Sequence, residues 1–167
     1  MSNESAYVSL GSNLGDRAAN LLLGIRGMME AGLPIRRLSH IYESEPVETF
    51  SQPDFLNMVA ELGLEDLHSP EQVMARLLRV EYALGRRRDI DKGPRVIDLD
   101  LLLVGNRTNH TELLILPHPR LHLRRFVLQP LVELAPDLVH PTIGETIATL
   151  LEGLKDQSQV RRWPRGG

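Results

Sequence analysis

The 167-residue chain is 42% hydrophobic and 25% charged, with a formal net charge of −3, and these values are ordinary for a globular protein. The acidic net charge argues against general nucleic-acid binding, and the absence of cysteine excludes disulfides and thiol chemistry. No apolar run approaches the ~20 residues that span a bilayer, and the N-terminus lacks the order of a signal peptide, so we expect a cytoplasmic protein without membrane contact.

Apolar periodicity divides the chain into short strands and helices. In chain order we expect a strand at 6–10, a turn at 11–15, a helix after residue 16, a strand from 35 to about 43, a loop at 44–53, a strand from 55, a helix from 70 to 84, a strand at 96–104, a strand around 113–116, a turn at 117–119 and two short C-terminal helices. This order predicts an α+β fold of the ferredoxin-like, split βαβ type, with an antiparallel sheet, both main helices on one face and a C-terminal extension. We expect a single domain over residues 1–167, with a frayed tail from about residue 161.

The beginnings of the two main helices can be read from their capping residues. Asp16 can cap the first helix, whose apolar face would include Leu22 and Met29. Ser69 is the expected N-cap of the second helix, and Gln72 would complete a capping box with it.

The strand that begins at Phe55 alternates with a period of two. Its even-numbered residues are apolar, whereas Phe55, Asn57, Val59 and Glu61 face the other way. Asn57 is polar among apolar neighbours, which favours a functional role; core packing is the simpler interpretation of Phe55.

Asp98 and Asp100 are the candidate metal ligands. They lie two apart on a predicted strand, so both side chains leave the same face and can converge on one metal or bridge two. Hard oxygen ligands without histidine or cysteine favour magnesium over zinc. An edge strand with a polar outer face is the alternative, but the apolar run around the pair indicates a central strand. The opposite, buried face would carry Ile97, Leu99, Leu101 and Leu103.

A basic cluster immediately precedes this pair. Between residues 86 and 95 lie Arg86, Arg87, Arg88, Lys92 and Arg95. On charge alone a solvated loop is the simpler interpretation. Next to two carboxylates that suit magnesium, however, guanidinium groups favour phosphoryl transfer.

Several motifs, in order along the chain, resemble the 6-hydroxymethyl-7,8-dihydropterin pyrophosphokinase family of folate biosynthesis. They are Leu-Gly-Ser-Asn-Leu-Gly-Asp at 10–16, Tyr-Glu-Ser-Glu-Pro-Val at 42–47, Gln-Pro-Asp-Phe-Leu-Asn at 52–57, Leu-Gly-Arg-Arg-Arg at 84–88, Gly-Pro-Arg-Val-Ile-Asp-Leu-Asp-Leu-Leu at 93–102 and Pro-His-Pro-Arg-Leu at 117–121, followed by Arg-Arg-Phe at 124–126. The resemblance implies a diphosphotransferase that moves the terminal diphosphate of ATP to the hydroxymethyl group of the pterin and releases AMP. It also implies two magnesium ions and in-line displacement at the β-phosphorus.

The resemblance further implies three sets of site residues. Asp98 and Asp100 would bind the metal and, with Arg86 and Arg95, form the catalytic set. The pterin would contact Ser44, Glu45, Val47, Phe55, Asn57 and Phe126. The nucleotide would contact Glu81, Arg86, Arg88, Lys92, Arg95, Leu101, His118 and Arg124. ATP and the reduced pterin are thus the expected partners, and we expect a monomer.

Some positions depart from the family pattern, chiefly on the adenosine side: Leu78, Lys92, Leu113 and Ile115. The turn at 11–16 has no Walker lysine, so it is not a P-loop, and we interpret it as a structural turn and cap. Two other functions stay open. A palm-type nucleotidyl transferase or cyclase also places paired aspartates on such a sheet, and an RNA-recognition module shares the fold but would show exposed aromatics and a basic sheet face.

Overall fold

The computed structural model describes residues 4–45, 53–65, 68–85 and 96–164. Its elements, in chain order, are β1 (Glu4–Ser12), α1 (Arg17–Glu30), β2 (Ile35–Leu38), β3 (Tyr42–Ser44), β4 (Phe55–Leu64), α2 (Pro70–Ala83), β5 (Asp98–Val104), β6 (Asn109–His110), β7 (Ile115–Leu116), a 3-10 turn (Leu121–Leu123), α3 (Arg125–Leu134), α4 (Ile147–Glu152) and β8 (Val160–Arg162). None of the helices in these ranges has both the length and the apolar character that a membrane crossing requires.

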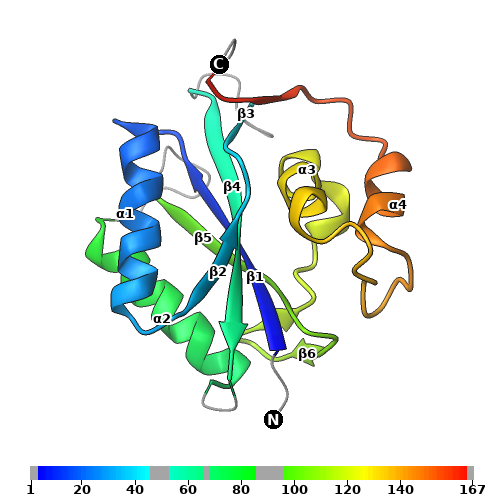
Figure 1. The fold of residues 1–167 in the computed structure, drawn as a ribbon, viewed down its shortest axis with the longest axis horizontal. Helices are drawn as coiled ribbons and strands as arrows, with labels where there is room; N and C mark the ends of the chain where they lie inside the picture. Colours follow the sequence, from blue (N-terminus) through cyan, green and yellow to red (C-terminus); the bar gives the residue numbers. More distant parts are fainter. Residues whose placement is uncertain (1–3, 46–52, 66–67, 86–95, 165–167) are drawn as a thin grey trace.

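The main sheet is antiparallel and confirms the predicted ferredoxin-like fold. Its strand order is β5-β1-β4-β3-β8, and β2 pairs with β4 beside β3. β6 and β7 form a separate two-stranded sheet. Figure 1 shows α1 and α2 on one face of the main sheet, as expected, and α3 and α4 on the other.

Each face of the sheet has its own hydrophobic core. Leu56, Met58 and Ala60 of β4 pack in the core beneath α1 and α2, whereas Val59 belongs to the core beneath α3 and α4. The predicted alternation of β4 is therefore confirmed. The capping box at Ser69 is confirmed as well.

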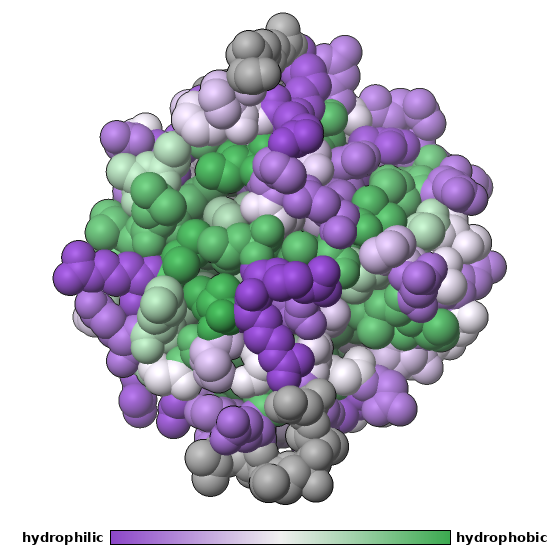
Figure 2. Space-filling model, viewed as in Figure 1, coloured by the Kyte–Doolittle hydropathy of each residue, from purple (hydrophilic) through white to green (hydrophobic). Residues whose placement is uncertain are grey.

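The buried face of α1 differs from the prediction. Leu22 and Met29 are 64% and 60% exposed, and the helix instead turns its glycine side toward the sheet and α2. A Cβ on Gly24 would lie 3.1 Å from Ile97 Cδ1, and one on Gly27 would lie 2.7 Å from Val80 Cγ1. The two glycines permit this close packing, and the larger apolar residues are left at the surface, where Figure 2 shows hydrophobic side chains among hydrophilic ones over α1.

The strand β5 lies at the edge of the sheet, not at its centre, so that prediction was wrong. Within the described residues it pairs only with β1, but the backbone N–H of His118 donates to Leu102 O at 2.9 Å along its open side. A bulge opposite Tyr7 and Val8 also breaks the expected alternation. As a result Leu103 packs in the α3 core and not with Leu99 and Leu101.

The C-terminal segment is more ordered than predicted. Arg161 and Arg162 belong to β8, which pairs with β3 and is seen in red beside it in Figure 1. Trp163 packs against the α1 core. Arg161 and Arg162 thus form a strand within the segment where a frayed tail was expected, and 165–167 lie outside the described residues.

Candidate active site

The two aspartates share the sheet face that carries α3. Leu99 and Leu101 pack in the opposite core, so Asp98 and Asp100 point away from α1 and α2, and both are partly buried. No cluster of three or more His, Asp or Glu side chains suited to a metal occurs in the described part of the chain. Two carboxylates still fit magnesium, because this ion commonly takes one or two carboxylates and completes its shell with water and phosphate oxygens.

Glu81 of α2 is tied directly to this pair. It is only 2% exposed, and its Oε2 accepts the backbone N–H of Leu99 at 2.7 Å. Leu99 stands between Asp98 and Asp100 on β5, whose outer edge pairs with no other strand among the described residues. The family resemblance implied a nucleotide contact for Glu81; in the structure its carboxylate supports the strand that carries Asp98 and Asp100.

A cross-strand row joins the aspartates to the residues expected to bind the pterin. Gly11 of β1 is opposite Asp98 on one side and Asn57 on the other. Because Gly11 has no side chain, its position leaves the space between Asp98 and Asn57 open. A Cβ there would lie 3.3 Å from Asn57 Oδ1 and 3.6 Å from Phe55 Cδ1. The sheet register thus brings the carboxylates and the Asn57 face together.

Asn57 is oriented by a buried hydroxyl. Its Nδ2 donates to Ser44 Oγ at 2.6 Å, and the two residues are 2% and 3% exposed. Phe55 is half-buried beside them, and Glu45 is exposed. The orientation of the amide is therefore fixed by the pairing of β3 with β4.

Phe126 and Arg124 stand at the beginning of α3. The Arg124 guanidinium carbon lies 5.4 Å from the centre of the Phe126 ring, a cation–π distance. Phe126 packs against the α3 core and so belongs to the same face of the sheet as Asn57.

The His118 side chain lies in surroundings that favour its neutral form. Burial and the nearby Arg124 lower its pKa to about 4, although Asp98 opposes the shift. Its Nδ1 accepts the backbone N–H of Arg120 at 3.1 Å, so the proton of the neutral ring is on Nε2. Such an N–H can donate to a phosphate oxygen without adding a charge.

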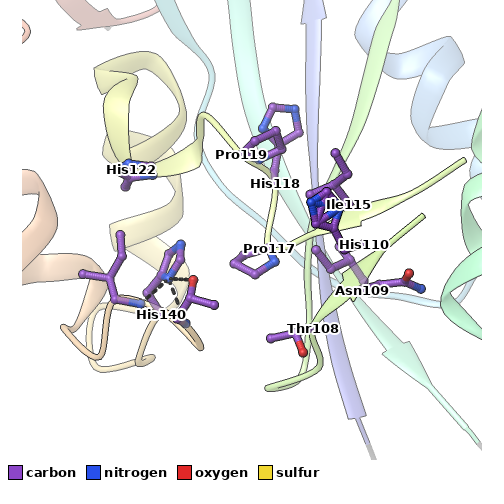
Figure 3. A pocket seen from close by; sticks show the side chains of 12 residues that line it. Thr108, Asn109, His110, Ile115, Pro117, His118, Pro119, His122 and His140 are labelled. Atoms are coloured by element: carbon purple, nitrogen blue, oxygen red, sulfur yellow. Dashed lines mark hydrogen bonds between the residues drawn. The ribbon is translucent and has the colours of Figure 1, made fainter. Parts of the chain in front are cut away.

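Behind His118 is a cavity of about 410 Å³. Figure 3 shows Pro117, His118 and Pro119 on one side of it, with His122 and His140 on the other. The lining also includes Ile115, which is 41% exposed.

Five of the expected site residues lie outside the described residues: Val47, Arg86, Arg88, Lys92 and Arg95. Leu101 is 2% exposed and its side chain packs in the α1 core, so only its backbone can face a nucleotide. Leu113 and Leu78 are exposed and half-buried respectively.

Sequence reasoning missed two polar side chains near the site. Asn13 Nδ2 donates to Pro53 O at 3.2 Å, and Arg17 donates to Asp54 O at 3.0 Å. Both act on the chain just before Phe55. Their partners are distant in sequence, so no local pattern indicated them; only the polar run after Gly11 could have drawn attention to this segment.

Known proteins resemble this chain over most of its length. The family model described as 7,8-dihydro-6-hydroxymethylpterin-pyrophosphokinase matches residues 7–136. "Folic acid synthesis protein fol1" of Pneumocystis carinii is 45% identical over 154 residues, which are 92% of this chain and 20% of that protein. The chain thus spans about a fifth of that relative's length. A protein of Bacillus subtilis named 2-amino-4-hydroxy-6-hydroxymethyldihydropteridine pyrophosphokinase is 38% identical, with 96% of this chain and 91% of that protein covered.

Solved structures support the fold. A Plasmodium falciparum HPPK-DHPS A437G structure with SDX-DHP matches with a TM-score of 0.71 and 15% identity, over 90% of this chain and 45% of that one. The structure titled "Crystal Structure Analysis of the HPPK-DHPS in complex with substrates" matches with a TM-score of 0.68 and 15% identity, over 90% and 43% of the two chains.

Proposed function

Because the chain belongs to the 7,8-dihydro-6-hydroxymethylpterin-pyrophosphokinase family, we propose that it transfers the diphosphate of ATP to the hydroxymethyl group of 6-hydroxymethyl-7,8-dihydropterin in folate biosynthesis. The products are AMP and the pterin diphosphate. The observation that carries this proposal is the row Asp98–Gly11–Asn57 across β5, β1 and β4. It sets a magnesium-type carboxylate pair beside a face suited to a flat, hydrogen-bonding ring.

Asp98 and Asp100 hold the metal in this proposal. Two bound magnesium ions would neutralise the phosphate charge and favour ionisation of the substrate hydroxyl. The chain's own contribution is to position the two carboxylates on one strand, with Glu81 fixing the N–H between them. His118 Nε2–H and the Arg124 guanidinium supply donors for phosphate oxygens, as do Arg86, Arg88, Lys92 and Arg95 in the same proposal.

The pterin lies over the Asn57 face. One amide hydrogen of Asn57 is donated to Ser44. The side-chain carbonyl of Asn57, which lies beside Gly11, and its second amide hydrogen can then pair with the amide-like edge of the ring. Phe55 and Phe126 offer aromatic faces to the ring, and Glu45 and Val47 belong to the adjoining loop. Stacking with oriented hydrogen bonds selects a flat heterocycle over a sugar or a lipid.

The activity is tested by mixing the protein with Mg²⁺, ATP and the reduced hydroxymethylpterin and separating the nucleotides by chromatography. We expect AMP to form only when the pterin is present. Release of pyrophosphate without free AMP would instead favour a nucleotidyl transferase, which transfers the AMP group to its acceptor.

The metal assignment is tested with Asp98→Asn and Asp100→Asn. Each removes one anionic ligand at constant size, and we expect kcat to fall by about 100-fold or more, the usual cost of losing a group that stabilises transition-state charge. Asp137→Asn is the matched control, because Asp137 is exposed in the turn that follows α3. Unchanged activity in Asp98→Asn would refute the assignment.

A further inference from the structure

The turn at residues 13–16 and the start of α1 are bonded to the chain that enters β4. Asn13 and Arg17 donate to the consecutive carbonyl oxygens of Pro53 and Asp54, at 3.2 and 3.0 Å. The next residue is Phe55, the first of β4. Side chains from the beginning of the protein therefore fix the backbone immediately before the proposed pterin face.

Arg17 also binds β3. Its NH1 lies 2.6 Å from Glu43 Oε2, and the same nitrogen bonds Asp54 O, so one guanidinium joins both strands. The Arg17 and Glu43 side chains are only 25% and 21% exposed. An ion pair withdrawn from solvent in this way is screened less than a surface pair.

Arg17 adds a side-chain tie to β3, which is only three residues long and pairs with β4 on one edge and β8 on the other. A short strand has few ladder hydrogen bonds to fix its register, yet Ser44 must stay opposite Phe55 for its hydroxyl to reach Asn57. Side chains alternate along a strand, so Glu43 faces α1 while Ser44 faces the other side. Arg17 therefore cannot touch a ligand over Asn57 and can act on it only through the backbone.

We infer that Arg17 is a positioning residue for the pterin: by joining Glu43 to Asp54 O, it maintains the β3–β4 register that sets Ser44 and Asn57. This inference rests on the proposed function. The apparent pterin affinity falls in proportion to the fraction of molecules that keep this register. Nucleotide affinity does not change, because His118 and Arg124, the proposed phosphate donors, lie on other segments of the chain.

The test measures binding of 6-hydroxymethylpterin, and separately of a non-hydrolysable ATP analogue with Mg²⁺, by titration calorimetry. Arg17→Ala should raise the pterin Kd about tenfold, since it removes hydrogen bonds to a charged group and a carbonyl. The Kd of the ATP analogue should stay within twofold. Glu43→Gln keeps a neutral acceptor for Arg17 and should raise the pterin Kd by only about threefold.

Arg26→Ala is the matched control. Arg26 stands on the same helix and pairs with Glu30, four residues along it, but the two side chains are 76% and 66% exposed. A folded Arg17→Ala protein with an unchanged pterin Kd, or an equal loss for both ligands, would overturn the inference. If Arg17→Ala does not fold, Glu43→Gln decides in the same way. Failure of the wild-type protein to bind the pterin at all is a different result, which refutes the proposed function itself.

Discussion

Glu81 offers the sharpest test of how this fold positions the proposed metal ligands. Its Oε2 accepts the Leu99 N–H at 2.7 Å between the two aspartates. Glu81→Ala removes that acceptor, whereas Glu81→Gln keeps an oxygen of nearly the same position and size. The pair of variants separates the hydrogen bond from the charge.

The magnitude follows from burial. Glu81 is 2% exposed, and a buried hydrogen bond to a charged group contributes about 1.5–3 kcal/mol. Because the Leu99 N–H also loses this acceptor, we expect Glu81→Ala to lower the free energy of unfolding by about 3 kcal/mol, which corresponds to about 6–12 °C in Tm for a chain of this size. Glu81→Gln should lose about 1 kcal/mol, because a neutral bond is roughly half as strong.

Activity should follow the geometry of β5. A displacement of reacting groups by about 1 Å can cost about 100-fold in rate, so kcat for AMP formation should fall by about that factor in Glu81→Ala and by less than about tenfold in Glu81→Gln. Thermal unfolding by circular dichroism and the rate of AMP release are the two measurements. Glu30→Ala is the control, an exposed helical glutamate whose ion pair is worth only about 0.3–0.5 kcal/mol.

The opposite pattern would refute this reasoning. If Glu81 acted chiefly on the nucleotide, both variants would raise the KM for ATP while kcat and Tm stayed near wild type. A Glu81→Ala protein with wild-type kcat would show that the support of Leu99 does not matter for the carboxylate pair.

Three further outcomes are expected. The pKa of the His118 ring, followed by NMR, should be about 4, and a midpoint near 6.5 would contradict the assigned environment. Because the fold favours the neutral ring, the contribution of His118 to stability is complete above about pH 6.5 and declines as the pH falls toward 4. Burial raises the pKa of Glu61, but hydrogen bonds from a serine and an arginine outweigh this effect and lower the pKa. The difference in unfolding free energy between wild type and Glu61→Gln, measured by urea denaturation, should therefore be largest above about pH 4.5 and shrink as the pH falls. Gly27→Ala should lower the unfolding free energy by about 1–2 kcal/mol in the same assay, although alanine favours a helix more than glycine does. The reason is that its Cβ would lie 2.7 Å from the stiff Val80 side chain. Gly153→Ala, whose Cβ would lie 3.6 Å from its nearest neighbour, should not destabilise the protein.

Local signals predicted much of the fold because their causes are local. The capping box at Ser69 depends on residues three apart, and the alternation of β4 depends only on which side chains prefer the core. The Asp98 and Asp100 face could be predicted for the same reason. Their relation to Asn57 could not, because it arises from the register of three strands.

The errors have a common cause as well. Leu22 and Met29 look like core residues by spacing, yet close contact of Gly27 with Val80 turns α1 away from them. A run of apolar residues suggested a central β5, but an edge strand can be as apolar when a helix and a turn cover it. Periodicity indicates that a residue is buried, but it does not indicate which element covers it.

The sequence by itself determined the α+β class, the paired carboxylates and the family, since these depend on spacing and on motifs that lie in the chain order. Tertiary structure alone decided that Gly11 stands between Asp98 and Asn57, that Glu81 supports Leu99, and that Arg17 joins Glu43 to Asp54. Each of these contacts connects segments distant in sequence. They depend on strand register and on the approach of a helix to a sheet edge, and neither leaves a periodic signal in the residues that take part.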